Sequence, residues 1–199
     1  MAKVIKFPAP VPEKFGLQRV VKKKEKGLDK HGQLNLFNGG GKLVRLNKLS
    51  PFEDALLHDD HDDVEGARKL YEKAIKENDS VADAYCNYGI LESKDGNHTK
   101  AIDCFSRSLK NDPRHFEAHY NLANLYADLR DYALAILHYK VAIEVEPTFS
   151  NSYFNLGLTY ALTKEYDQAI EVLNQYKMMS SEEDQKIANN LIEVLSRTS

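Results

Sequence analysis

Hydrophobic residues recur along the middle of the chain with the spacing of amphipathic helices. Two consecutive stretches each place their apolar residues on one side of a helix: Leu122, Leu125, Tyr126 and Leu129 in the first, and Ala135, Ile136, Tyr139, Ala142 and Ile143 in the second. Asp112-Pro113 and Glu146-Pro147 separate such stretches, because the residue before a proline avoids the helical region. The pattern therefore predicts short helices, each with one face to bury.

This pattern repeats with a period of 34 residues over residues 82–179. Aligned positions keep their residue type: Tyr85, His119 and Tyr153; Asn87, Asn121 and Asn155; Gly89, Ala123 and Gly157; Ala101, Ala135 and Ala169. The small residues let two antiparallel helices approach closely, while the aromatic residues fill the space between them. A fixed period with two helices per unit predicts a solenoid of stacked helix pairs.

The repeated residues resemble the tetratricopeptide repeat, whose pattern runs aromatic, Leu-Gly, aromatic, Ala, aromatic, Ala and Pro. The matches are His119, Leu122-Ala123, Tyr126, Ala135, Tyr139, Ala142 and Pro147 in residues 116–149; Tyr153, Leu156-Gly157, Tyr160, Ala169 and Leu173 in residues 150–181; and Tyr85, Tyr88-Gly89, Ala101, Phe105, Ser108 and Pro113 in residues 82–115. Glu92 departs from the pattern where an aromatic is usual, and Ser181 departs from it where Pro is usual. The resemblance implies that the first helices of successive repeats line a concave groove.

Helix signals also flank the three strong repeats. Ser50, Pro51 and Glu53 supply an N-cap, a proline at the first helical position and a capping-box acid, and a second helix near residues 64–78 completes a degenerate repeat. Residues 184–197 form an amphipathic pattern with four residues facing inward: Ile187, Leu191, Val194 and Leu195. We therefore expect an all-α solenoid of about four repeats (48–81, 82–115, 116–149 and 150–181), a capping helix over 182–199 and an N-terminal arm over 1–47.

Charge separates the arm from the solenoid. The 199-residue chain has a net charge of −3. Residues 1–47 carry 11 Lys/Arg against 3 Asp/Glu, giving +8, and the remainder carries 16 against 27, giving −11. Because Pro8, Pro10, Pro12 and the run of glycines at 39–41 disfavour regular structure, we expect the arm to be mostly disordered. The basic run at residues 19–26 suggests nucleic-acid contact; the alternatives are a solvated tail or one that folds back on the acidic solenoid.

A short motif in the arm resembles the peptide by which bacterial polymerases and repair proteins bind the sliding clamp. Its residues are Gln33, Leu34, Leu36 and Phe37, with Asn35 between the two leucines. The resemblance implies that Gln33 hydrogen-bonds at a pocket mouth while Leu36 and Phe37 enter apolar pockets. Two alternatives are a strand that pairs with residues 42–46 as a hairpin, and packing of Leu36 and Phe37 on the end of the solenoid.

The register of the repeats also gives candidate groove residues: Asn87, Ile90, Glu117, Tyr120, Asn121, Asn124, Asn151, Phe154, Asn155 and Leu158. Asn87, Asn121 and Asn155 recur once per repeat, and such amides could pair with the backbone of an extended peptide. The alternative is that they bond to adjacent helices. The two-carboxylate clamp of chaperone-binding family members is not predicted, because its Lys, Asn, Asn, Lys and Arg are replaced by Cys86, Ile90, Asn121, Asn151 and Asn155.

The sequence gives little support for redox, metal-binding or catalytic chemistry. Cys86 and Cys104 are interpreted as reduced, buried residues, and residues 58–63 as a solvated acidic turn that holds no metal. His119 is expected to pack between helices, and no catalytic or cofactor motif is present. With no signal peptide or membrane span in the sequence, we expect a cytoplasmic protein. The function predicted is a non-catalytic adaptor or scaffold that binds a partner protein in the groove; the alternative is a bacterial replication or repair adaptor tethered to the sliding clamp, with the arm contacting nucleic acid.

Overall fold

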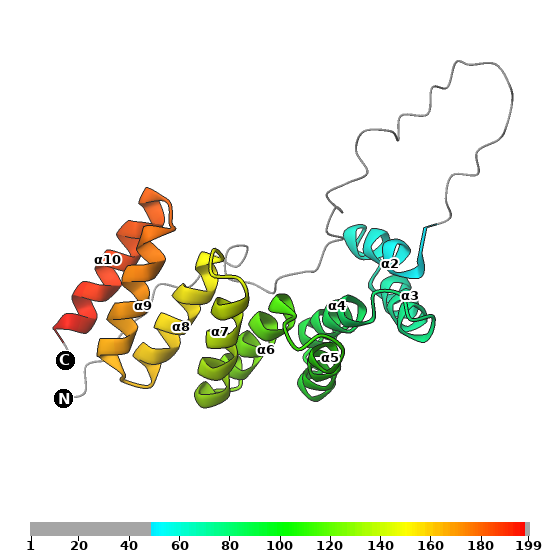
Figure 1. The fold of residues 1–199 in the computed structure, drawn as a ribbon, viewed down its shortest axis with the longest axis horizontal. Helices are drawn as coiled ribbons and strands as arrows, with labels where there is room; N and C mark the ends of the chain where they lie inside the picture. The colour runs from blue at the N-terminus through cyan, green and yellow to red at the C-terminus, as the bar shows by residue number, and fades with distance from the viewer. Residues whose placement is uncertain (1–48, 198–199) are drawn as a thin grey trace, which may run out of the picture.

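The computed structural model describes residues 49–197. Residues 1–48 and 198–199 lie outside this part, and with them the predicted arm, its basic run and the motif at residues 33–37. Within residues 49–197 the chain forms helices and no strands: α2 (Pro51–Asp60), α3 (Val64–Lys76), α4 (Val81–Lys94), α5 (His98–Asn111), α6 (Phe116–Asp128), α7 (Tyr132–Val145), α8 (Ser150–Leu162), α9 (Tyr166–Met178) and α10 (Glu182–Ser196). They follow one another along an elongated molecule, from α2 and α3 at one end to α10 at the other (Figure 1).

Local sequence accounts for where several helices begin. The Ser50 hydroxyl accepts from the Glu53 backbone, and the Glu53 carboxylate accepts from the Ser50 backbone, so both halves of the predicted capping box are present at α2. Asp63 and Asp131 each accept a hydrogen bond from a backbone N–H in the first turn of α3 and α7. These side chains occupy backbone donors that the helix itself leaves unpaired.

The turn between the two helices of each pair uses the same backbone conformation. Asp62, Gly96, Arg130 and Lys164, spaced by 34 residues, all have positive φ, with values of 58°, 77°, 63° and 66°. A residue in this conformation reverses the chain and ends the first helix. Only Gly96 adopts it without a steric cost, because the other three carry a Cβ atom.

The core lies between the two helices of each pair and between neighbouring pairs. Gly89 and Gly157 make the close approach possible, since an added Cβ atom would lie 2.8 Å from the Phe105 ring and 2.8 Å from Leu173, respectively. Buried apolar residues form two clusters that meet at α6: the first contains Phe52, Tyr71, Phe105 and Leu125, and the second contains Tyr120, Tyr139, Leu173 and Leu195. The predicted helix-pair solenoid is therefore the observed fold.

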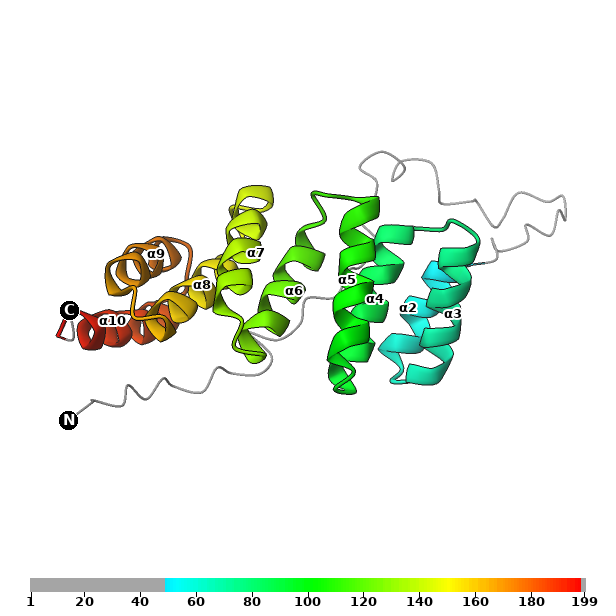
Figure 2. The same ribbon diagram turned by 90° about the horizontal axis from the view of Figure 1, so that it is seen from below.

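The last helix packs on the end of this array. α10 lies against α9 at the end opposite α2 and α3 (Figures 1 and 2), and it buries Ala188, Leu191 and Leu195. The expectation that Val194 faces inward is wrong, because 44% of it is exposed. Asn189 lies 34 residues after Asn155, so α10 occupies the place of a first helix with no second helix after it in the described part.

Leu129 also departs from its predicted place on an apolar helix face. It is 43% exposed because α6 ends at Asp128, which leaves Leu129 as the C-cap in the turn.

Candidate binding groove

The first helices of neighbouring repeats contact one another directly. α4 contacts α6 and α6 contacts α8, whereas the second helices α3, α5, α7 and α9 make no comparable contacts with each other. The first helices therefore lie on the inner side of the array, and the candidate groove runs across α4, α6 and α8. All ten predicted groove residues come from these three helices.

Side-chain amides link the first helices across this surface. The Asn121 amide donates to the Cys86 sulfur over 3.7 Å, and the Asn155 amide donates to the Tyr120 hydroxyl over 3.2 Å and to Asn124 Oδ1 over 2.9 Å. Asn124 Oδ1 also accepts from the Tyr139 hydroxyl of α7. Asn121 and Asn155 thus make the bonds to adjacent helices that the sequence left open as an alternative.

Burial divides the ten predicted residues into two groups. Asn87, Ile90, Tyr120, Asn121, Phe154 and Asn155 are buried, whereas Glu117, Asn124, Asn151 and Leu158 remain partly exposed. Buried amides must pair inside the protein, because an unpaired polar group away from water is costly. A partner that lies in the groove would therefore meet the second group, supported by the first.

His115, in the turn before α6, contacts the acidic residues Asp83 of α4 and Glu117 of α6 at the edge of the groove. His115 Nδ1 accepts from the Ala118 backbone N–H over 3.2 Å, so Nε2 carries the proton and donates to Asp83 Oδ1 over 2.9 Å. Glu117 lies 3.5 Å from the same Nδ1 atom. His115 is buried while Asp83 and Glu117 reach the surface, so the rim of the groove beside α4 and α6 is anionic.

The thiols and phenols near the groove are held in their neutral forms. Burial raises the pKa of the Cys86 thiol, with the nearby Glu117 and Asp83 carboxylates adding to the shift. Burial also raises the pKa of Tyr120 to about 12 and that of Cys104 to about 11. Both cysteines are free and buried, as the sequence predicted, and a protonated buried thiol is a poor nucleophile.

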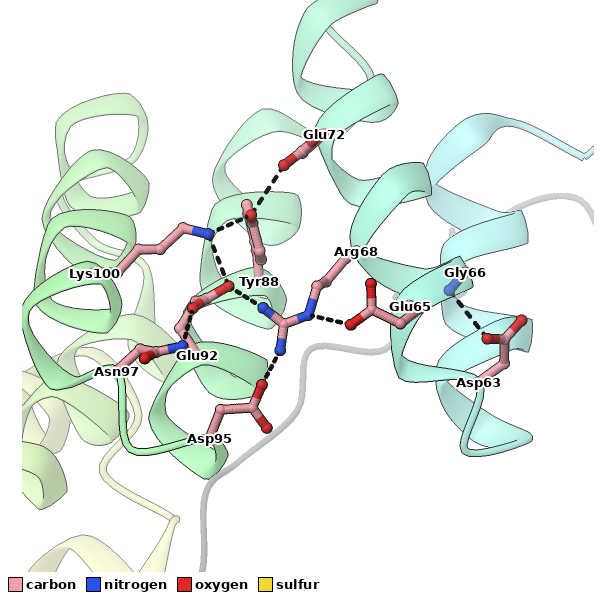
Figure 3. Close-up of polar contacts among 10 residues, drawn as sticks. All are labelled: Asp63, Glu65, Gly66, Arg68, Glu72, Tyr88, Glu92, Asp95, Asn97 and Lys100. Carbon is pink, nitrogen blue, oxygen red and sulfur yellow. Dashed lines mark hydrogen bonds and ion pairs between the residues drawn. The ribbon is translucent and has the colours of Figure 1, made fainter.

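A second polar cluster joins α3, α4 and α5 (Figure 3). Its centre is Glu92, whose side chain is 1% exposed and pairs with Arg68 of α3 and with Lys100 of α5. Arg68 also pairs with Asp95, and Asn97 donates to Glu92 over 2.9 Å. The chain of contacts extends outward from Lys100 through the Tyr88 hydroxyl to Glu72.

These contacts fix the charge state of Glu92. Burial alone would raise its pKa, but hydrogen bonds from Lys100 and Asn97 and the charge of Arg68 outweigh burial and lower it. Glu92 is therefore a carboxylate whose two oxygens are occupied by residues of its own chain. The sequence marked Glu92 as a departure from the repeat pattern but missed its partners; a buried acid in the core register is the signal that calls for a nearby cation.

A pair of histidines lies between α6 and α7. His119 Nε2 is 3.2 Å from the Pro113 carbonyl oxygen, so it donates there, and His119 Nδ1 accepts from His138 Nδ1 over 2.9 Å. His138 also stacks on Tyr126. The prediction that His119 packs between helices is confirmed, whereas its partner His138 was missed, because neither residue is near the other in sequence.

No group of three or more His, Cys, Asp or Glu side chains within residues 49–197 is placed to hold a metal ion. None of the described helices is both long and apolar enough to cross a membrane.

The fold and its inner surface define a class of protein, the α-solenoid built from antiparallel helix pairs. Two family models described as tetratricopeptide repeat match the chain, one over residues 89–151 and the other over residues 70–103 and 138–171. The chain belongs to the tetratricopeptide repeat family. None of the curated proteins matches it significantly.

Solved structures share the fold. The MamA protein is 19% identical with a TM-score of 0.62, and the match covers 74% of this chain and 85% of that chain. The first tetratricopeptide domain of Spaghetti (RPAP3), bound to the HSP90 peptide SRMEEVD, is 20% identical with a TM-score of 0.54 and covers 59% of this chain and 91% of that chain. The TPR2B domain of yeast Sti1, in a complex with pHsp70, is 21% identical with a TM-score of 0.54, and the match covers 59% of this chain and 98% of that chain.

Proposed function

We propose that this chain is a non-catalytic adaptor or scaffold that holds a peptide or helix of a partner protein against α4, α6 and α8. The observation that carries the proposal is the row of partly exposed side chains on adjoining first helices, supported by a buried layer of amides and aromatic residues. A surface whose supporting residues are already packed and hydrogen-bonded loses less conformational entropy when it binds a partner. The similar domain of Spaghetti holds an HSP90 peptide and that of Sti1 is in a complex with pHsp70, which supports partner binding by this fold.

The groove chemistry favours a different peptide from theirs. The positions of the two-carboxylate clamp hold Cys86, Ile90, Asn121, Asn151 and Asn155, none of which carries a positive charge. Asp83 and Glu117 add negative charge at the rim, and a peptide carboxylate would be repelled there. We therefore propose a partner segment that is neutral or cationic where it meets α4 and α6 and apolar where it meets Leu158 of α8.

The test is capture of partners by the full chain from a lysate of its source, with identification by mass spectrometry. Glu117→Lys with Asn151→Lys is expected to abolish capture, because both side chains are on the groove and their replacement adds two cations. Glu171→Lys with Asn174→Lys makes the same chemical change on exposed positions of α9 and is expected to leave capture intact. Equal capture by all three proteins, each folded by circular dichroism, would refute groove binding.

A second proposal concerns residues 33–37, outside the described part of the chain. The sequence Gln-Leu-Asn-Leu-Phe favours binding to a bacterial sliding clamp through Gln33, Leu34, Leu36 and Phe37. Leu36→Ala with Phe37→Ala is expected to lower affinity for a purified clamp at least tenfold, measured by surface plasmon resonance. Leu43→Ala with Leu46→Ala removes similar apolar side chains from the same arm and is expected to change nothing; no binding by the unaltered protein would reject the proposal.

A further inference from the structure

The side of α7 that faces away from the core differs from the same side of the other second helices. Three of its positions are Leu134, Leu137 and Val141. The residues 34 positions earlier are Lys100, Asp103 and Arg107 in α5, and those 34 positions later are Gln168, Glu171 and Gln175 in α9. Only in α7, among the second helices compared, are all three positions apolar.

These three residues form one stripe along the helix. They are spaced by three and four residues, so they fall on one side of α7. Leu134 is 36% exposed and Leu137 is 55% exposed, and Val141 is half-buried. In α5 the matching cations lie over aromatic rings of α4, Lys100 above Tyr88 and Arg107 near Tyr85, so that helix presents a charged surface where α7 presents leucine.

The charges at the two ends of α7 indicate what covers the stripe. Arg130 precedes the helix and Glu144 lies near its C-terminal end, both exposed and each seven residues from Leu137. Neither has an ion-pair partner among residues 49–197. If a second α7 packs antiparallel with Leu137 at the two-fold axis, the end of α7 that Arg130 precedes lies beside the end of the other copy that carries Glu144. A parallel arrangement would place like charges together.

We propose that α7 is a dimer interface, in which a second copy of the chain packs its own α7 antiparallel against the stripe of Leu134, Leu137 and Val141. The same surface serves both copies, as a two-fold interface requires. The helix dipoles of the two copies also oppose one another in this arrangement. The groove on the first helices stays open in each copy, so the particle would carry two grooves.

The size of the surface sets the strength of the association. α7 has 14 residues and is thus about 21 Å long, so one helix pair with its flanks buries less than the roughly 1,600 Å² of a standard interface. We therefore expect a monomer–dimer equilibrium with a dissociation constant of about 10–100 µM, because small interfaces are weak and transient.

Sedimentation equilibrium of the full chain tests the proposal. The apparent mass is expected to rise from 22.6 kDa toward twice that value as the concentration rises. Leu137→Glu is expected to remain monomeric at every concentration, since it places two carboxylates together at the two-fold axis. Leu57→Glu makes the same change at a residue of similar exposure, 44%, in α2 and is expected to dimerise like the unaltered protein.

A disulfide trap tests the geometry separately. With Leu137→Cys the two introduced thiols meet across the axis, so oxidised glutathione is expected to give a covalent dimer; the native Cys86 and Cys104 are buried and do not compete. Leu57→Cys is expected to give none. A protein that stays monomeric throughout, or a dimer that Leu137→Glu leaves unchanged, would overturn the proposal. Dimerisation without a covalent crosslink in the Leu137→Cys variant would overturn the placement of Leu137 at the two-fold axis.

Discussion

Glu92 places a carboxylate where the equivalent residues of the next two repeats are Tyr126 and Tyr160. Its charge is stable there because Arg68 and Lys100 supply cations from the helices on either side. Replacing one member of a buried ion pair leaves the others without their partner. Glu92→Gln is therefore expected to lower the free energy of unfolding by about 2 kcal/mol, measured by urea denaturation.

Asp95 provides the matched comparison for Glu92. It also pairs with Arg68, but 47% of its side chain is exposed, and exposed ion pairs contribute little. Asp95→Asn is expected to cost less than about 0.5 kcal/mol. If the two variants lost the same unfolding free energy, burial would not be the reason that the Glu92 contacts stabilise the fold.

The His119–His138 pair is expected to make the stability of the folded protein depend on pH. Burial, with the neighbouring His119, lowers the pKa of His138 to about 4, and burial lowers that of His119. In the unfolded chain both would titrate near a pKa of about 6.5, so the unfolded state binds more protons below that pH. Stability is thus expected to be complete above a pH of about 6.5 and to fall as the pH drops toward about 4.

The difference in unfolding free energy between the unaltered protein and His138→Gln isolates this effect. Measured by denaturation at several pH values, the difference is expected to change between a pH of about 6.5 and about 4 and to be constant above. If the difference in unfolding free energy for His138→Gln did not change with pH, protonation of the pair would not be coupled to unfolding.

At the scale of the element, the turns contain backbone strain that a substitution by glycine can relieve. Arg130 and Lys164 hold the positive φ that Gly96 holds without strain. Arg130→Gly and Lys164→Gly are each expected to raise the free energy of unfolding by about 0.5–1 kcal/mol, since glycine adopts this conformation freely. Thermal and urea denaturation measure the gain. Ala133→Gly, in the first turn of α7, is the control and is expected to destabilise, because glycine is a poor helix former.

The elements themselves could be predicted, because the repeat register constrains each helix several times over. The apolar spacing, the prolines after Asp112 and Glu146, and the capping box at Ser50 all indicate the same helices. The predictions for Val194 and Leu129 were wrong for related reasons. Val194 lies on the last helix, which has no following neighbour in the described part, and Leu129 lies in a turn after the end of α6. Periodicity describes a helix interior and says little about its exposed end.

At the scale of the whole molecule, the candidate groove could be located from sequence but not its accessible residues. Register assigns Asn121 and Asn155 to first helices that adjoin one another, yet it carries no information on the depth of each side chain. Depth depends on how closely α4, α6 and α8 approach, and this follows from packing between residues about one repeat apart in the chain. The partners of Glu92 were missed for the same reason.

The two core clusters predict that the ends of the array unfold separately. Leu195 of α10 is fully buried in the second cluster. Because each repeat of a solenoid contacts only its neighbours, Leu195→Ala is expected to speed amide hydrogen exchange in α8, α9 and α10 while leaving α2–α5 unchanged. Mass spectrometry of peptides after exchange measures this. Faster exchange throughout the array would show a single cooperative unit.

The amide bonds between first helices suggest that the two edges of the array differ in stiffness. Asn121 and Asn155 join α4, α6 and α8 along one edge, whereas the second helices α3, α5, α7 and α9 approach one another less closely than these first helices do. If such an array bends, we expect the bonded edge to keep its length, so that the spacing between α5, α7 and α9 changes most. An occupant that changes the curvature of the groove would thereby widen or narrow the spacing on the far edge, where the leucines of α7 lie.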